Sequence, residues 1–581
     1  MHHTTFILGK DAPLESTIST LQGRLQHLGF HIEERSWLNA VEGIWSAHIC
    51  DRDCPLLFAN GKGSTRLACL ASALGEFIER LSTLYFWKSY DLCPHVKASA
   101  FVYHPQERWF KTGGDNWPSD LLTPELQTFY NPSNTVDAQC LIDFNAGNDT
   151  RGICTLPYVR ERDGQTVYFP VNLIDCLYGS NGLASGNTPL EARTQALSEI
   201  FERSIKARII SQGICLPDVP EEVIARYPRI ERGIAELREA GFGILVKDAS
   251  LGGQYPVINV TLLNPHDQGC FACFGAHPRF EIALERALIE LMQGRPLDAM
   301  FGFSPPAFDL EETASTPNLE SHFVDSSGVI HWKFFGDAPD HAFVDWNFST
   351  TTAEDNAWCV QRIHQDGHDI YIADFTQLEV YACRILVPGV SEIYPIDDLE
   401  FENHALTIHG IRELILNLPD LDDEECADVL ETLNEFNVAD HRPVAELIGL
   451  AADAGSFWSD LRVGELKTLL ALALGDEAAT LEGCEWILNF DHIHLQRRQV
   501  YACIQNLIHL ADMGDSGPYL DALSLLYGAG PLAQAHALIM QEDRFMGLSA
   551  PGANFAGCDM QLKLLQAYDK VRAVYLPGTH V

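Results

Sequence analysis

Two octapeptides of nearly the same sequence constrain the fold of this chain more than any other feature. Residues 73–80 read ALGEFIER, residues 196–203 read ALSEIFER, and a looser copy, ALERALIE, lies at 283–290. In each copy, charged residues recur three or four positions apart, and such residues share one face of a helix. The repetition predicts three amphipathic helices, each with a charged stripe beside a buried face.

The middle helix has the fullest stripe. At 100° per residue, it spans about 80° of the helix circumference and consists of Glu191, Gln195, Glu199 and Glu202. Like charges on one face repel, more strongly when desolvated. Mg²⁺ prefers oxygen ligands and offsets such crowding, and phosphate oxygens could be met by Lys10, Arg80, Arg203 and Arg286. Converging stripes would form a metal–nucleotide site, whereas a single stripe is typical of a solvated helix face.

Glycine-rich segments precede two of these helices. GKGST lies at 61–65, and SNGLASGNT at 180–188, where Asn187 or Thr188 is a candidate N-cap. Such loops let backbone N–H groups approach an anion at the start of a helix. The chain has no Walker A loop, GxGxxG fingerprint, HRD–DFG pair or GxSxG elbow. Any nucleotide site is therefore of an unusual type.

Strands and helices interleave up to about residue 395, which suggests an α/β or α+β architecture. We expect an α+β domain over 1–395. Strand-like runs lie at 45–49, 166–174, 255–263, 270–276, 368–375 and 380–388, and helical runs at 14–29, 66–83, 188–211, 221–240 and 279–294.

Beyond this domain the sequence shows only helical periodicity. The expected helices are 405–417, 422–436, 442–453, 459–474, 477–488, 494–512, 518–528, 531–542 and 560–577. Short helices with brief breaks predict an all-α domain over 396–581, with tetratricopeptide-like pairs and a role in interaction or dimerisation.

The charge balance limits the partners. With 39 basic and 80 acidic residues, the net charge is −41, which repels phosphate backbones and argues against direct nucleic-acid binding. No apolar run spans a bilayer, and the N-terminus lacks a signal-peptide pattern, so we expect a cytoplasmic protein without membrane contact. The sixteen cysteines are scattered and predict buried free thiols.

Several segments together resemble the YcaO family. They are GKGSTRLACLASALGEFIERLS (61–82), SNGLASGNTPLEARTQALSEIFER (180–203), SLGGQYPVINV (250–260), GAHPRFEIALERALIELMQGR (275–295) and VDSSG (324–328). The resemblance is strong over 1–395 and looser through the helical tail. It implies a YcaO-like domain that binds ATP and Mg²⁺ in a fold of its own.

The resemblance also implies roles for individual residues. The Mg²⁺ ligands would be Glu76, Glu79, Glu191, Glu199, Glu202 and Glu290. Lys10, Arg203 and Arg286 would contact phosphates, and Thr17 stands where relatives have a serine near the nucleoside. Asn187 and Gln195 are further candidates for cofactor binding, and the expected catalytic residues are Arg203, Arg286 and Glu199.

The chemistry of the family is backbone-amide activation, in which ATP phosphorylates the oxyanion formed when a nucleophile attacks the amide. No partner domain for azoline formation is evident, and the chain closes on YLPGTHV rather than a proline-rich tail. The resemblance therefore implies an accessory factor in aspartate β-methylthiolation of a small-subunit ribosomal protein by a radical-SAM methylthiotransferase, acting as a homodimer.

Other functions remain open at this point. The chain could be a non-catalytic, nucleotide-binding adaptor that recruits the methylthiotransferase through its helical tail. It could also be a peptide-modifying enzyme that forms thioamides or azolines, or a ligase that joins a carboxylate to an amine.

Overall fold

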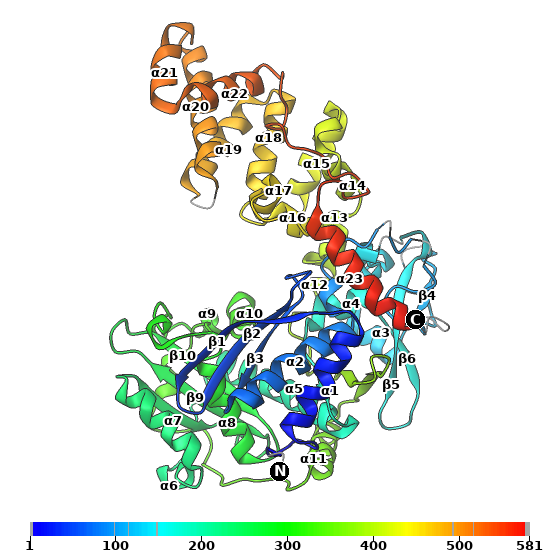
Figure 1. The fold of residues 1–581 in the computed structure, drawn as a ribbon, viewed down its shortest axis with the longest axis vertical. Helices are drawn as coiled ribbons and strands as arrows, with labels where there is room; N and C mark the ends of the chain where they lie inside the picture. Colours follow the sequence, from blue (N-terminus) through cyan, green and yellow to red (C-terminus); the bar gives the residue numbers. More distant parts are fainter. Residues whose placement is uncertain are drawn as a thin grey trace.

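The computed structural model describes residues 4–93, 95–97, 99–113, 116–146, 149–490, 493–514 and 516–575. A broad body of sheets and helices holds the residues up to about 400, and the helices after it form an arm (Figure 1). The last helix, α23 (Asp559–Tyr575), returns to the body. The predicted mixed helix-and-sheet fold with a helical C-terminal region is confirmed.

Three antiparallel sheets build the described part of the body. The first has the order β1-β2-β3, with bounds Ile32–Val41, Ile44–Asp51 and Phe58–Gly63. The second has the order β10-β9-β8, with bounds Cys270–Ala276, Val257–Leu263 and Gly243–Asp248. The third has the order β4-β5-β11-β12-β7, with bounds Arg108–Phe110, Ile153–Arg160, Tyr371–Phe375, Tyr381–Leu386 and Leu183–Gly186, and β6 (Thr166–Pro170) pairs with β5.

The three acidic helices each pack closely on a strand from a different sheet. These helices are α2 (Arg66–Ser82) on β3, α5 (Pro189–Gln212) on β7 and α8 (Phe280–Leu291) on β10. A glycine on each strand permits the close approach, because an added Cβ would lie too near the helix backbone. That Cβ would be 2.3 Å from Cys69 O at Gly61, 2.8 Å from Ala192 N at Gly186 and 2.4 Å from Ala283 O at Gly275. Each sheet thus holds one acidic helix.

Threonine side chains begin two of these helices. Thr65 accepts a hydrogen bond from Ala68 N, and Thr188 accepts one from Glu191 N at 3.2 Å. Thr188 is therefore the N-cap of α5, and the other candidate, Asn187, precedes it. Capping of this kind satisfies backbone donors that the first turn leaves unpaired.

The remaining helices of the body are mostly short. Their bounds are α1 (Leu14–His27), α3 (Pro124–Tyr130), α4 (Val171–Tyr178), α6 (Glu221–Ile224), α7 (Pro228–Glu239), α9 (Leu310–Ala314), α10 (Thr316–Val324), α11 (Thr352–Gln365) and α12 (Asp398–Phe401). None of the described helices is long and apolar enough to cross a membrane.

Two sequence predictions in the body were wrong in part. The expected strand 166–174 ends at Pro170, and the residues after it begin α4. The expected helix 221–240 is broken before Pro228, because proline disfavours the helical conformation of the preceding residue. The predicted strands also omitted β1, β3, β4, β5, β7 and β8.

The described regular elements of the arm are helices. Their bounds are α13 (His404–Ile408), α14 (Arg412–Leu416), α15 (Asp423–Glu435), α16 (Val444–Leu447), α17 (Phe457–Asp460), α18 (Val463–Leu474), α19 (Glu477–Asn489), α20 (Leu495–Asp512), α21 (Leu520–Tyr527) and α22 (Ala529–Ile539). The tetratricopeptide-like pairing stays a prediction.

Three expected helices of the tail differ from the structure. Helix 405–417 is interrupted at Gly410, whose φ of +83° suits glycine. Helix 442–453 is the single turn α16, and 459–474 is divided between α17 and α18. Helix 560–577 corresponds to α23, and its last two expected residues lie outside the described residues.

Helix α23 is fastened to the body by buried hydrogen bonds. Trp87 Nε1 donates to Leu564 O at 2.9 Å, and Tyr575 OH donates to Ser82 O at 2.8 Å. One apolar core runs from α2 through the third sheet into the arm. The domain boundary at residue 395 stays a prediction, and α23 packs across it.

Candidate active site

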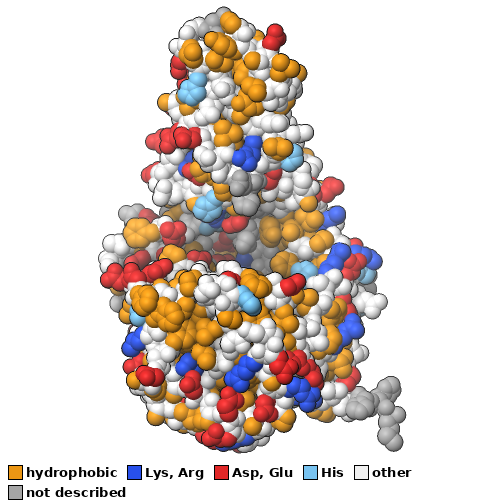
Figure 2. Space-filling model, turned by 90° about the vertical axis from the view of Figure 1, so that its left-hand side faces the viewer, with side chains coloured by type: hydrophobic (Ala, Val, Ile, Leu, Met, Phe, Trp, Pro, Cys, Tyr) orange, Lys and Arg blue, Asp and Glu red, His pale blue; other side chains and the backbone are white. Residues whose placement is uncertain are grey.

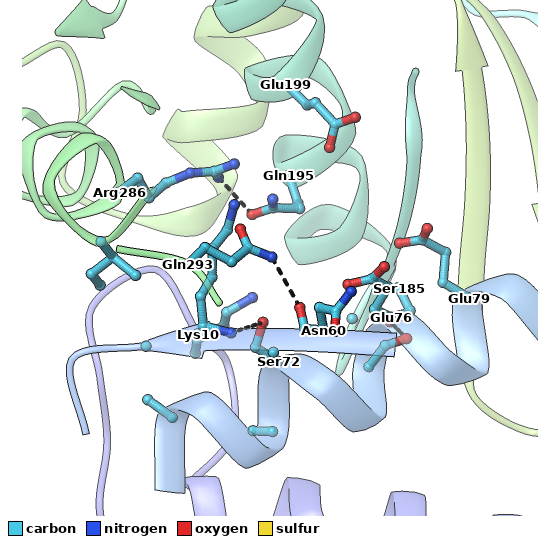
Figure 3. A pocket seen from close by; sticks show the side chains of 18 of the residues that line it. Lys10, Asn60, Ser72, Glu76, Glu79, Ser185, Gln195, Glu199, Arg286 and Gln293 are labelled. Carbon is cyan, nitrogen blue, oxygen red and sulfur yellow. Dashed lines mark hydrogen bonds between the residues drawn. The ribbon is translucent and has the colours of Figure 1, made fainter. Parts of the chain in front are cut away.

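A cavity of about 1120 Å³ lies where α2, α5 and α8 meet, with N-terminal residues along one side. Every site residue nominated from the sequence lines it: Lys10, Thr17, Glu76, Glu79, Asn187, Glu191, Gln195, Glu199, Glu202, Arg203, Arg286 and Glu290. In Figure 3 the labelled glutamates and Arg286 reach from different helices toward one space. The charged stripes of α2, α5 and α8 therefore converge on one cavity.

Helices α5 and α8 run in the same direction along the cavity. Near their starts, Lys10 Nζ lies 3.2 Å from Glu191 Oε1, and Gly9 lies against Ile282. Farther along, Arg286 Nη1 donates to Gln195 Oε1 at 2.8 Å (Figure 3). From position 191 to 202 the helix rises about 16 Å, so the cavity has a Lys10 end and a distant Glu290 end.

Each of the six glutamates faces a basic side chain. Besides Lys10 with Glu191, Arg203 lies 3.0 Å from Glu199 and Arg286 lies 3.8 Å from Glu202. The remaining pairs are Arg80 with Glu76 at 3.4 Å, Arg80 with Glu79 at 3.7 Å, and Lys62 with Glu290. These cations offset the repulsion among the crowded carboxylates.

Burial and neighbouring charges shift the pKa values of several of these carboxyls. Burial raises the pKa of Glu79 to about 8 and also raises the pKa values of Glu76 and Glu202. Burial acts on Glu290 in the same sense, but the Lys62 ammonium reverses the effect and holds its pKa below the ordinary value. Clustered shifts of this size are typical of functional sites.

The cavity has the side chains that a Mg²⁺-bound triphosphate needs. Carboxylate oxygens suit Mg²⁺, and the basic groups suit phosphate oxygens. Among the described residues, no acceptor meets the buried Nε and Nη1 groups of Arg203, although its guanidinium stacks on Phe323 at 4.1 Å. No three His, Cys, Asp or Glu side chains of the described residues form a ready metal cluster, because basic groups stand among the carboxylates. The side chains that line the cavity therefore fit both Mg²⁺ and a triphosphate.

At the Lys10 end of the cavity, hydrogen bonds from amide and hydroxyl groups connect three segments of the chain. Thr17 Oγ1 donates to Asn187 Oδ1 at 2.8 Å, and Asn187 Nδ2 donates to Glu191 at 3.0 Å. The backbone N–H of Asp11 donates to the same carboxylate at 3.0 Å. Helix α1, the start of α5 and the N-terminal segment are thereby joined around Glu191.

The glycine-rich segments are largely strands rather than the expected loops. Residues 61–63 belong to β3 and residues 183–186 to β7, so their glycines accommodate helix packing. Because Gly61 and Gly63 face α2, the intervening Lys62 points to the other side of the sheet, into the cavity.

Sequence reasoning missed two basic residues of this site. Lys62 contacts Glu290, and Arg295 lies 3.1 Å from Asp325 at the Glu290 end. A lysine between two glycines on a strand that precedes an acidic helix could have indicated the first. Arg295 lies beyond the end of α8 and gives no periodic signal.

Two family profiles match the chain. A family profile described as "YcaO cyclodehydratase, ATP-ad Mg2+-binding" matches residues 60–391. The chain belongs to the YcaO family. A second profile, described as "YcaO cyclodehydratase C-terminal domain", matches residues 409–575. The predicted family is confirmed, and so are the predicted cofactors, ATP and Mg²⁺, which are the ligands of the family's domain.

Two curated relatives match nearly the whole chain. "Ribosomal protein S12 methylthiotransferase accessory factor YcaO" of Escherichia coli (strain K12) is 47% identical over 575 residues, which cover 98% of each chain. An "Uncharacterized protein" of Haemophilus influenzae is 44% identical over 580 residues, covering 98% of this chain and 99% of the relative.

Solved YcaO-type structures are more distant. One titled "The structure of YcaO from Methanopyrus kandleri bound with AMPPCP and Mg2+" has a TM-score of 0.41 and 18% identity, covering 69% of this chain and 97% of that one. A "Heterocyclase in complex with substrate and Cofactor" has a TM-score of 0.45 and 17% identity, covering 68% of this chain and 56% of that one.

Proposed function

We propose that this chain is an ATP- and Mg²⁺-dependent enzyme that activates a polypeptide backbone amide. One observation carries the proposal. Six glutamates on α2, α5 and α8, which pack on three different sheets, meet with their basic partners in one cavity. A purely structural role would leave these charges in solvent, where each would be hydrated at little cost.

The basic side chains have a double use in this proposal. In the ligand-free chain they neutralise the glutamates, and with nucleotide bound they donate to phosphate oxygens. The unpaired N–H groups of Arg203 are already available for such an acceptor. Bound Mg²⁺ would be held by Glu76, Glu79, Glu191, Glu199, Glu202 and Glu290 and would neutralise charge on the transferred phosphoryl group.

The proposed reaction requires a nucleophile of the thiol, sulfide or amine class. The nucleophile forms a bond to the amide carbonyl carbon and loses its proton, and the carbonyl oxygen takes the terminal phosphoryl group of ATP as ADP departs. The carbon–oxygen bond then breaks as the lone pair of the amide nitrogen forms a carbon–nitrogen double bond. Phosphate leaves with the former amide oxygen, and the resulting cation loses a proton to solvent. Arg203, Arg286 and Glu199 are the proposed catalytic residues, since all three line the cavity and Arg203 lies 3.0 Å from Glu199.

The biological setting follows from the relative of Escherichia coli. We propose that the chain is an accessory factor for β-methylthiolation of an aspartate of ribosomal protein S12 by a radical-SAM methylthiotransferase, in the cytoplasm and as a homodimer. The net charge of −41 favours association with a basic ribosomal protein.

Oxygen tracing tests the proposal. Ribosomal protein S12 with ¹⁸O in its backbone carbonyls is incubated with the chain, ATP, Mg²⁺ and the methylthiotransferase, and the released phosphate is analysed by mass spectrometry. Backbone ¹⁸O in phosphate is the expected result. Unlabelled phosphate would contradict amide activation, and label arriving only from a side-chain carboxylate would indicate a ligase.

An adaptor function is the second candidate, and the tip of the arm favours it. Leu525 and Leu526 of α21 are 88% and 73% exposed, and hydrophobic side chains gather at this end of the arm in Figure 2. Exposed apolar faces of this kind are typical of docking sites. If a folded Glu199→Gln variant without ATPase activity still supports full S12 modification in cells, the chain is an adaptor.

A further inference from the structure

One face of the first sheet lines the cavity with mostly polar side chains, beside Leu38, which pairs with Ser46. In the register of this sheet, Ser46 pairs with Lys62, His48 with Asn60, and Ser36 with His48. Directly opposed residues, and residues two apart on one strand, share a face. Ser36, Ser46, His48 and Asn60 therefore point the same way as Lys62, and all of them line the cavity.

Gln293 approaches this face from the end of α8. Its Nε2 donates to the backbone oxygen of Asn60 at 3.3 Å (Figure 3), and Gly294 N donates to Ser46 Oγ at 3.1 Å. We call Ser36, Ser46, His48, Asn60 and Gln293 the acceptor face. It belongs to the Glu290 end of the cavity, because Gln293 follows Glu290 by less than one helical turn.

The internal hydrogen bonds of the acceptor face fix its orientation and leave two groups available. His48 Nδ1 and Asn60 Oδ1 are 2.8 Å apart, which orients the Asn60 side chain. Among the described residues, no partner faces Asn60 Nδ2 or Gln293 Oε1. One amide donor and one amide acceptor thus remain open.

This inventory matches an amide better than a phosphate. A backbone amide has one N–H donor and one carbonyl acceptor, which Gln293 Oε1 and Asn60 Nδ2 complement. Lys62, the cation on this sheet face, is already paired with Glu290, and other basic groups of the cavity stand among the glutamates. Phosphate oxygens would be drawn to those cations.

The acceptor face also lies beside the phosphate-binding part of the cavity. Asn60 and Lys62 are two residues apart on β3, or about 7 Å, and Lys62 contacts Glu290. The mouth at this end is bordered by the Arg295–Asp325 ion pair at 3.1 Å and by Val324, which is 69% exposed. A segment of polypeptide could enter there and bring one amide next to the transferred phosphoryl group.

We propose that the acceptor face is the binding site for the backbone amide of the acceptor polypeptide, with Asn60 donating to its carbonyl oxygen and Gln293 accepting from its N–H. This inference rests on the proposed function and names the substrate subsite of the same cavity. It places the polypeptide beside the Glu290 end, next to the transferred phosphoryl group, and leaves the Lys10 end to the rest of the nucleotide.

A binding experiment separates the two ligands. The Asn60→Ala/Gln293→Ala double variant, the wild-type chain and a Gln22→Ala control from the exposed side of α1 are compared. Purified, fluorescently labelled ribosomal protein S12 is titrated in Mg²⁺ and a non-hydrolysable ATP analogue, and the affinity for the analogue is measured separately by calorimetry. Loss of two hydrogen bonds of ordinary strength predicts about thirtyfold weaker S12 binding in the double variant.

The outcomes are distinct. Selective loss of S12 affinity in the double variant, with Gln22→Ala behaving as wild type, supports the proposal. S12 affinity within twofold of wild type would overturn it, and so would a greater loss of nucleotide affinity, which would assign the acceptor face to the nucleotide. Failure of the wild type to bind S12 would also overturn it, while failure to bind the nucleotide analogue would refute the proposed function itself.

Discussion

The Lys62 ammonium on β3 pairs with the Glu290 carboxylate of α8, although 228 residues separate them in the sequence. Glu202 of α5 lies close enough to raise the pKa of Lys62 together with Glu290, against the effect of burial. One lysine from the first sheet therefore balances carboxylates on the helices that pack on the other two sheets. Its position depends on Gly61 and Gly63, which let α2 pack against their side of β3, so that Lys62 points to the opposite side.

Replacing Lys62 should leave the repulsion between the Glu290 and Glu202 carboxylates without compensation. We expect Lys62→Met to lower the free energy of unfolding by about 1 kcal/mol, because the ion pair is partly exposed. Added Mg²⁺ should raise the melting temperature of the variant more than that of the wild type, since the metal takes over the neutralising role. Equal Mg²⁺ responses in thermal melts would count against a metal beside Glu290.

Neutralising single carboxylates should disable the site without unfolding the chain. Glu199→Gln and Glu290→Gln are expected to reduce Mg²⁺-dependent ATP hydrolysis at least a hundredfold, because metal and phosphate charge would lose a ligand. Glu239→Gln, on the exposed side of α7, is the matched control and should hydrolyse ATP as the wild type does. Phosphate release assays that find full activity in both site variants would refute the assignment.

Adding one methyl group at the strand–helix contacts should be costly. In Gly275→Ala the new Cβ would lie 2.4 Å from Ala283 O and Ala287 N, so α8 would have to shift away from β10. We expect a loss of about 2–3 kcal/mol in the free energy of unfolding, together with weaker nucleotide binding.

Gly23→Ala provides the control for that substitution. No heavy atom of the described residues lies within 4 Å of a Cβ at Gly23 in α1, so alanine there should leave stability unchanged or raise it by up to about 1 kcal/mol. Urea denaturation curves that place both variants at the same midpoint would contradict the tight strand–helix contact.

Acid should destabilise the chain partly through His322 of α10. Burial, with the Lys206 ammonium, lowers the pKa of His322 to about 4, below its ordinary value of 6.5. Between these values the unfolded chain binds a proton that the folded chain excludes. The free energy of unfolding should therefore fall with falling pH, by about 1.4 kcal/mol per pH unit from this residue.

Substitution isolates that contribution. His322→Gln should flatten the pH dependence of the denaturation midpoint between pH 6.5 and 4.5, whereas His27→Gln at the exposed end of α1 should leave it unchanged. An unaltered slope in His322→Gln would mean that this histidine titrates normally in the folded chain.

The acidic helices were predictable because their signal is local and repeated. The spacing of Glu76 and Glu79, and of Glu199 and Glu202, already indicated shared helix faces, and the similarity of the two octapeptides suggested a shared purpose. That all the nominated residues line one cavity could not be read from spacing, since three sheets bring their helices together.

Other features needed tertiary information. Lys62 has no periodic pattern, and its direction depends on how closely α2 packs on β3. Strand β1 escaped prediction because polar residues occupy both of its faces, including the charged stretch 33–35. The acceptor face likewise combines isolated residues of different strands, which only the register of the sheet aligns.

The central claim is that carboxylates from three helices gather around a Mg²⁺-bound triphosphate. A crystal structure of the chain with Mg²⁺ and a non-hydrolysable ATP analogue tests it most directly. We predict phosphates in the cavity, Mg²⁺ ligated by members of the six-glutamate set, and Lys10, Arg203 and Arg286 turned from carboxylates to phosphate oxygens. Nucleotide bound elsewhere, with all six glutamates still paired to their lysines and arginines, would contradict the account.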